Sequence, residues 1–281
     1  MAVRKLCGEG FPNFYAEDIS HSCDSIILAV EWLMGTCKTA AEYDWRYDAD
    51  GNPLIEDCQK VMFANYYNMP ETMSVFDKLY DNIGGMQDDF IAYWDVVSKK
   101  FAGNKYVIGY DPLNEPFPSS LFSDPTILLN NGRFDQTKLA PMFKRAFEKY
   151  HTNDPTQIMM FEGTQGPDTI GIGQGYILPV GYTGLPGGDE YAKTQMLNEH
   201  TYCCQMNTEV CAKGEPPMAL EGECKSFHDR RLSQRSKDAE RLNVPLFITE
   251  FGACYDSVNC EMEVGLVADA CDDNLISWGY W

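Results

Sequence analysis

The sequence predicts an α/β fold in which a parallel sheet is covered by helices. From about residue 86 onward, strand-like and helix-like segments alternate along the chain. The strand-like segments are short apolar runs, as expected for strands that are buried on both faces. This alternation is typical of parallel sheets, because the helices connect neighbouring strands. Doubly wound sheets and closed barrels share the pattern, so the motifs must decide between them.

The expected elements follow one another without a linker-like break in composition. Residues 86–101 place apolar side chains at helical spacing, and Ala102-Gly103-Asn104 can end that helix. Three further helices are expected at residues 137–150, at 226–242, which is highly charged and therefore expected to be exposed, and around 261–271. The expected strands are residues 106–113, 157–161, 197–203, 244–251 and 275–281. A Gly/Pro-rich stretch over 163–188 is expected to be a long loop.

The composition bounds the class of protein and its partners. The chain has 281 residues, of which 44% are hydrophobic, so it can bury the core of one large domain. Its 42 acidic and 22 basic residues give a formal charge of −20. Such an acidic surface repels phosphate backbones, so nucleic acid is not an expected partner. The excess charge suits an acidic lumen, and it equally suits solubility alone.

Eleven cysteines indicate an oxidising compartment. Four of them crowd residues 203–224, and Cys254 and Cys260 flank another loop. Their spacing fits no zinc site, so no metal is expected. We expect loop disulfides in a secreted or lysosomal/vacuolar protein, with free thiols as the alternative. The odd count leaves at least one cysteine unpaired or paired outside this chain.

The sequence contains neither a recognisable signal peptide nor an apolar run long enough to span a membrane. Residues 1–20 lack an apolar core, so no signal peptide is present. The most apolar run, residues 25–34, is shorter than the roughly 18 residues of a membrane span and contains Glu31. A secreted protein with this sequence is therefore expected to have a further N-terminal part.

Two glutamates each follow an apolar strand, where parallel α/β folds carry their functional residues. Glu115 stands in an Asn-Glu-Pro motif after residues 106–113, and Glu250 stands in a Thr-Glu-Phe-Gly motif that closes residues 244–251. Either alone could be a turn or a cap. Two such carboxyl groups on one rim, about 5 Å apart, suit a retaining glycosidase. Partial desolvation would raise the pKa of Glu115 towards that of a general acid.

Two further positions carry polar or aromatic groups near this rim. His200 and Tyr202 alternate in an expected strand, so both side chains can point to the same side. Trp278 and Trp281 lie in the last expected strand, where core packing is the ordinary role. We expect only Trp281 to stack on a sugar ring.

In this order along the chain, the motifs resemble those of clan A glycoside hydrolases, specifically family 5. The resemblance implies a (β/α)8 TIM barrel, with residues 1–281 forming a single partial barrel domain. It also implies a retaining mechanism with Glu115 as acid/base and Glu250 as nucleophile, without a metal or organic cofactor. The implied substrate-binding residues are Asn114, His200, Tyr202 and Trp281.

Three loop motifs resemble the endoglycoceramidase-like branch of this family. They are residues 7–12 (CGEGFP), the Gly-Tyr-Thr and Pro-Gly-Gly stretches within 181–188, and the Tyr-Cys pair at 202–203. The resemblance implies hydrolysis of the bond between a sugar and ceramide or a related lipid. We therefore expect a glycolipid or oligosaccharide substrate, transient contact with a membrane surface, no transmembrane segment, and a monomer.

The chain departs from the family pattern at both ends. A histidine motif and an arginine that precede the CGEG loop in the family are absent, and the chain stops on Trp281. We therefore expect an incomplete barrel in which strands four to eight are present and the first three strands and the last helix are missing. Two alternatives stay open: an endo-β-glucanase that acts on polysaccharide, and a non-catalytic carbohydrate- or lipid-binding remnant.

Overall fold

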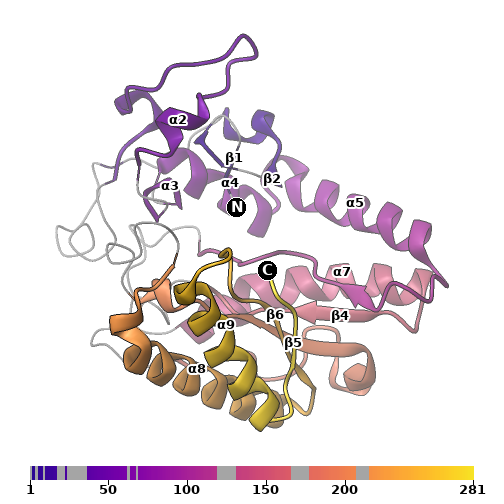
Figure 1. Ribbon diagram of the computed structural model, residues 1–281. Helices are drawn as coiled ribbons and strands as arrows, with labels where there is room; N and C mark the ends of the chain where they lie inside the picture. Colours follow the sequence, from indigo (N-terminus) through magenta and orange to yellow (C-terminus); the bar gives the residue numbers. More distant parts are fainter. Residues whose placement is uncertain are drawn as a thin grey trace.

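A five-stranded parallel sheet forms the centre of the computed structural model (Figure 1). The structure describes residues 2–3, 6–8, 10–17, 23, 37–61, 64–67, 69–118, 131–165, 177–206 and 215–281. The strands are β3 (Gly109–Tyr110), β4 (Ile158–Phe161), β5 (Gln195–His200), β6 (Leu246–Glu250) and β7 (Ser277–Trp278). Each strand pairs with the next one along the chain. A doubly wound sheet reverses its strand order, so this uninterrupted order is that of a barrel wall.

Some of the helices lie between these strands in sequence, and the others precede β3. The longer ones are α4 (Pro70–Tyr80), α5 (Met86–Phe101), α7 (Ala140–Asn153), α8 (Glu221–Leu242) and α9 (Val258–Asp273). The short ones are α2 (Ile55–Cys58), α3 (Ala64–Tyr67) and α6 (Asn131–Phe134). A π-helical turn, Asp135–Leu139, joins α6 to α7. Figure 1 shows α8 and α9 side by side along β5 and β6, while α5 runs beside α7. A second parallel pair, β1 (Ala2–Val3) and β2 (Gly10–Phe11), lies near α4.

The predicted helices at residues 86–101, 137–150 and 261–271 are confirmed. Helix α5 has the predicted bounds, and Gly103 lies just beyond its end with a positive φ. Helix α7 buries an apolar stripe of Met142, Phe143, Ala146 and Phe147. Burial of this stripe against the core is what stabilises the helix.

The prediction of an exposed helix at residues 226–242 is wrong in one respect. Helix α8 exists, but Arg231, Arg235 and Asp238 on it are buried. The buried Glu199 of β5 accepts hydrogen bonds from both arginines. Glu199, which is distant in the sequence, therefore compensates for the burial of two arginines that the sequence pattern predicted to be exposed.

Three strand predictions need correction in their extent. Of residues 106–113 only Gly109–Tyr110 are in a strand, and Tyr106 and Ile108 are 83% and 62% exposed. Residues 275–281 likewise contain only β7, and Leu275 is 94% exposed. Both strands border the described sheet, so each has a single strand partner. The strand expected at 197–203 begins earlier, at Gln195, and ends at His200.

The predicted loop disulfides are confirmed. They join Cys7 to Cys58, Cys23 to Cys37, Cys203 to Cys224 and Cys254 to Cys260. Cys204 is also disulfide-bonded, and Cys271 is a buried free cysteine. The apolar run at residues 25–34 lies outside the described residues. Within the described part of the chain, no helix is both long and apolar enough to span a membrane.

Candidate active site

The two predicted catalytic glutamates meet through one histidine nitrogen. Glu115 follows β3, Glu250 ends β6, and His200 ends β5, so all three stand at the carboxyl edge of the sheet. The Nδ1 atom of His200 lies 3.0 Å from Glu115 Oε1 and 3.4 Å from Glu250 Oε2. One oxygen of each glutamate and this ring nitrogen lie within 4.8 Å of one another. The fold therefore joins residues that are 135 positions apart in the sequence.

The backbone of Glu115 is held in the left-handed region, with φ at 46°. A non-glycine residue in that region costs on the order of 1 kcal/mol or more, so neighbouring contacts must hold it there. The backbone N–H of Glu115 donates to Glu162 Oε1 at 3.0 Å. Glu162 is fully buried and directly follows β4. The buried carboxylate thus fixes the turn that presents Glu115.

Tyr202 and His200, which the sequence predicts to point to the same side, both contact the glutamates. The hydroxyl of Tyr202 donates to Glu250 Oε2 over 3.1 Å. The second ring nitrogen of His200, Nε2, lies 3.1 Å from Thr249 Oγ1, and that hydroxyl donates to Asn198. Because both of its nitrogens have partners, the imidazole ring is fixed in orientation.

The structure adds three polar residues that the sequence interpretation missed. Two of them are the carboxylates Glu162 and Asp111, which lie close to His200. The third is Asn198, whose side-chain amide donates to Asp111 Oδ2 at 2.8 Å. Glu162 comes directly after an apolar strand, which is the same signal that identified Glu115 and Glu250. Asp111 likewise comes directly after β3. Applying the strand-end rule to every strand would have found both carboxylates.

Carboxylates surround His200 and make it a cation at neutral pH. Burial alone would lower the pKa of His200, but the charges of Glu162, Glu115 and Glu250 outweigh burial and raise it to about 10. Desolvation raises the pKa of Asp111 to about 6, and it raises the pKa of the fully buried Glu162 well above its usual range. The cluster therefore carries less negative charge than its composition indicates.

The two glutamates are shifted in opposite directions. Burial would raise the pKa of Glu115, but the hydrogen bond and charge of His200 outweigh it and lower that pKa. Burial raises the pKa of Glu250 despite the opposing charge of His200. The expectation that desolvation raises the pKa of Glu115 is therefore wrong, because the imidazolium is closer to Glu115 than to Glu250.

The other two predicted binding residues lie at the edges of this cluster. Asn114 lines a cavity of about 660 Å³, together with apolar groups that include Phe11, Tyr15 and Trp94. Trp281 is 66% exposed, and its backbone N–H donates to the carbonyl of Phe251, the residue after Glu250. The chain end therefore runs alongside the end of β6.

Two groups in the cluster have the separation of metal ligands. They are Asp111 with Glu162 and His200, and Glu115 with His200 and Glu250. In both groups the His200 nitrogens already contact Glu115 and Thr249. The cationic state that the raised pKa of His200 favours has no lone pair to offer a metal. The arrangement suits proton transfer and charge stabilisation.

Comparison with known proteins identifies the family of this chain. The family model described as "Cellulase (glycosyl hydrolase family 5)" matches residues 61–281. The chain belongs to glycosyl hydrolase family 5. The predicted (β/α)8 barrel class is thereby confirmed, and the described sheet contributes five parallel strands to it.

Three individual proteins are similar to most of this chain. An endoglycoceramidase of Cyanea nozakii is 26% identical over 278 residues, which are 99% of this chain and 47% of that protein. An endoglycoceramidase of Hydra vulgaris is 29% identical over 232 residues, or 82% of this chain and 38% of that protein. The solved endo-glycoceramidase II of Rhodococcus sp. has a TM-score of 0.61 at 21% identity, covering 92% of this chain and 53% of its own. The chain thus spans about half the length, or less, of these relatives.

Proposed function

We propose that this chain is part of a retaining glycoside hydrolase that cleaves the β-glycosidic bond of glycosphingolipids or related glycolipids. The observation that carries the proposal is the pair Glu115 and Glu250, with carboxylate oxygens within 4.8 Å of each other. Retaining enzymes place their carboxyl groups about 5 Å apart, whereas inverting enzymes need roughly 6.5–9.5 Å to admit a water. The short separation supports double displacement.

In the first step, Glu250 attacks the anomeric carbon and the bond to the leaving oxygen breaks. Glu115, in its protonated form, donates its proton to that oxygen and releases the lipid alcohol. In the second step, Glu115 takes a proton from water, whose oxygen attacks the anomeric carbon and displaces Glu250. The Tyr202 hydroxyl donates to Glu250 Oε2, so it orients the carboxylate with Oε1 towards the sugar.

The electrostatics of the site bear on this cycle. Catalysis needs a protonated Glu115 and an ionised Glu250, whereas the directions of their pKa shifts favour the reverse distribution. Only a minor fraction of the free chain would then carry the active protonation state. A substrate or an additional group that weakens the contact between His200 and Glu115 would enlarge that fraction.

Relatives favour a lipid-linked substrate. All three relatives above are named endoglycoceramidases, and one solved structure of the Rhodococcus protein is a complex with ganglioside GM3. We extend this substrate class to the present chain, with Asn114 and Trp281 as sugar-binding residues and residues 1–281 as one domain. The disulfides support a secreted-type protein, and we propose a lysosomal, vacuolar or extracellular location for a monomer. A β-glucan is the second candidate substrate, because the matching family model is described as cellulase.

Parallel assays test the activity and the substrate. A fluorescent glycosphingolipid and a soluble β-glucan would be given to the unmodified chain, to Glu115→Gln and to Glu250→Gln. We expect turnover of the glycolipid, and a fall of about 10²–10⁴ in the Glu115 variant. The exposed Glu261→Gln is the matched control. Turnover of glucan alone would overturn the lipid assignment, and equal rates in all four proteins would indicate a non-catalytic remnant.

Azide distinguishes the two roles. In Glu250→Ala, azide can enter the vacated space and attack the anomeric carbon directly, which inverts a β-substrate to an α-glycosyl azide. In Glu115→Ala, azide instead attacks the α-linked glycosyl-enzyme and gives the β-product. An activated aryl glycoside makes both reactions measurable, because its leaving group needs no protonation. The opposite pair of products would exchange the two assignments.

A further inference from the structure

Residues 199–203 lie at and just beyond the end of β5, and four of them contact helices α8 and α9. Arg231 donates through Nε to the carboxylate of Glu199 and to the carbonyl of His200, both at 2.8–2.9 Å. Thr201 and Cys203 are both buried and also contact these helices. Tyr202 stands between these two and is the member of the run that donates a hydrogen bond to Glu250.

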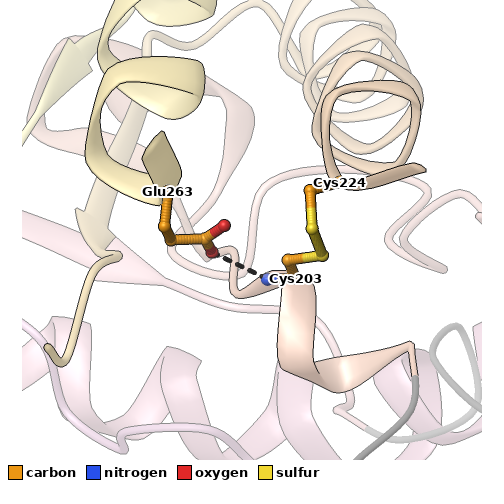
Figure 2. A group of neighbouring side chains, drawn as sticks. All are labelled: Cys203, Cys224 and Glu263. Atoms are coloured by element: carbon orange, nitrogen blue, oxygen red, sulfur yellow. Dashed lines mark hydrogen bonds between the residues drawn. A yellow bond between two sulfur atoms is a disulfide. The ribbon is translucent and has the colours of Figure 1, made fainter. Parts of the chain in front are cut away.

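One buried carboxylate holds the residue after Tyr202. Glu263 of α9 accepts the backbone N–H of Cys203 at 2.8 Å, and Figure 2 shows its side chain pointing at that nitrogen. In the same view Cys203 is joined by a disulfide to Cys224 at the start of α8. Glu263 and Cys203 are each only 2% exposed. Cys203 is thus attached to both helices at once.

Glu263 is also connected, through His228, to Thr201, the residue before Tyr202. The second oxygen of Glu263 lies 3.1 Å from His228 Nε2, and His228 Nδ1 lies 2.8 Å from Thr201 Oγ1. His228 and Thr201 are both fully buried. The chain of contacts therefore runs from Cys203 through Glu263 and His228 back to Thr201, with Tyr202 enclosed between its two ends.

A buried polar network of this kind is a poor source of stability. Removing such groups from water costs free energy, which their mutual hydrogen bonds only offset, and apolar side chains of similar size would stabilise the fold equally well. The network instead fixes the orientation of the groups that it joins, because hydrogen bonds depend on direction more strongly than apolar packing does. The network holds Thr201 and Cys203, which stand on either side of Tyr202, and the Tyr202 side chain contacts Glu250.

We propose that His228 and Glu263 are positioning residues that hold the Tyr202 hydroxyl against Glu250. The inference deepens the proposed function and rests on it, since Glu250 is the nucleophile there. Neither residue touches the reacting atoms, and both act through Thr201 and Cys203 on Tyr202. Loss of either contact would let the Tyr202 ring move and would leave the nucleophile less well oriented, with substrate binding largely retained.

A double-mutant cycle tests this connection. Tyr202→Phe removes a hydrogen bond to a charged group, and we expect kcat to fall about 10- to 100-fold. Glu263→Gln should lower kcat about tenfold with little change in KM, and should lower it less than twofold in the Tyr202→Phe background. Independent, additive losses in the two backgrounds would overturn the proposal. Glu261→Gln, which is exposed on the same helix, is the control for general effects on α9.

A second pair of variants covers the case in which Glu263→Gln fails to fold. Thr201→Val keeps the shape of the side chain and removes the hydroxyl that His228 contacts, whereas Thr201→Ser keeps that hydroxyl. The valine variant should repeat the loss of kcat, and serine should restore most of it. Equal losses in both, with unchanged unfolding temperature, would mean that packing rather than the hydroxyl matters.

A spectroscopic readout separates failure of this inference from failure of the proposed function. The chain would be labelled with ¹³C at the tyrosine Cζ, and the Tyr202 signal assigned from its loss in Tyr202→Phe. We expect that signal to shift in Glu263→Gln and to stay in place in Glu261→Gln. If the chain shows this shift but no turnover, the positioning network is supported and the proposed glycosidase activity is overturned. A signal unmoved in Glu263→Gln would overturn the network itself.

Discussion

Two regions of the molecule are held together by different means. The sheet region, comprising β4–β6 with helices α7–α9, is joined by long-range packing and buried ion pairs. The N-terminal region, residues 37–67, has two helices of four residues each and is tied by disulfides and local hydrogen bonds. His200 and Glu250 stand on strands of the first region, and Glu115 follows β3, which pairs with β4 of that region. Their positions therefore depend on packing between distant segments. In the N-terminal region, disulfides add covalent links to the packing of Trp45 and Tyr66 in the core.

Local contacts in the N-terminal region illustrate the difference. Asp57 accepts hydrogen bonds from the backbone and the guanidinium of Arg46 and from Lys60, which lie within 11 positions of it. Glu42 caps the backbone N–H of Thr39. Asp57 is buried, but Arg46 and Lys60 are exposed. In the sheet region both partners of such contacts are buried and belong to different elements, as with Glu199 and Arg231. Losing such a buried contact should therefore cost more than losing one at the surface.

The largest effect is expected from Glu199→Leu in the sheet region. The change leaves Arg231 and Arg235 buried without the carboxylate that both contact, and breaking a buried pair in this way costs about 3–5 kcal/mol. Urea unfolding followed by circular dichroism measures the loss. Glu240 is exposed on α8, the helix that carries both arginines, and Glu240→Leu should change little. If both variants lose the same small amount, the buried ion pairs do not hold this region.

A smaller and regional effect is expected from replacing Cys7 and Cys58 together by serine. This disulfide spans 51 positions, and removing such a link costs about 2–4 kcal/mol through the entropy of the unfolded chain. Limited proteolysis should then cut residues 37–67 first. Replacement of Cys254 and Cys260, which are 6 positions apart, should have less effect. Equal protection of both regions in the first variant would contradict the comparison.

The smallest effect should leave the fold intact and displace a pH profile. His200 as a cation lowers the pKa of Glu115 and opposes the burial that raises the pKa of Glu250. In His200→Gln both glutamates therefore have higher pKa values. Both limbs of the kcat/KM profile report the ionisation of this coupled pair of glutamates, and both should move to higher pH. A profile that moves in the Cys7 and Cys58 variant, or moves downward in His200→Gln, would refute this assignment.

Local signals in the sequence predicted part of the fold well. Helix α5 has the expected bounds because its apolar spacing and Gly103 lie within the helix itself or just beyond it. The strand that ends in Glu250 was found because it is a short, apolar run bounded by turn residues. His200 contacts Glu115 and Tyr202 contacts Glu250 because the carboxyl ends of β3, β5 and β6 lie at the same edge of the sheet.

The features that sequence alone could not supply depend on distant partners. The charged face of α8 is buried because Glu199, about 30 positions away, faces Arg231. Strand β3 is shorter than its apolar run because the described sheet pairs it on one side only. The lowered pKa of Glu115 follows from the distance to His200, which no pattern of residues specifies.

The shared nitrogen of His200 has a consequence for measurement. Because Nδ1 contacts both Glu115 and Glu250, a proton gained by one changes the affinity of the other for its own proton. Titration of this site then yields macroscopic constants that belong to the trio, and neither limb of a rate profile reports one residue. Single substitutions will likewise change two ionisations at once. The contributions of Glu115 and Glu250 to the rate can therefore be separated only when His200 is varied alongside them.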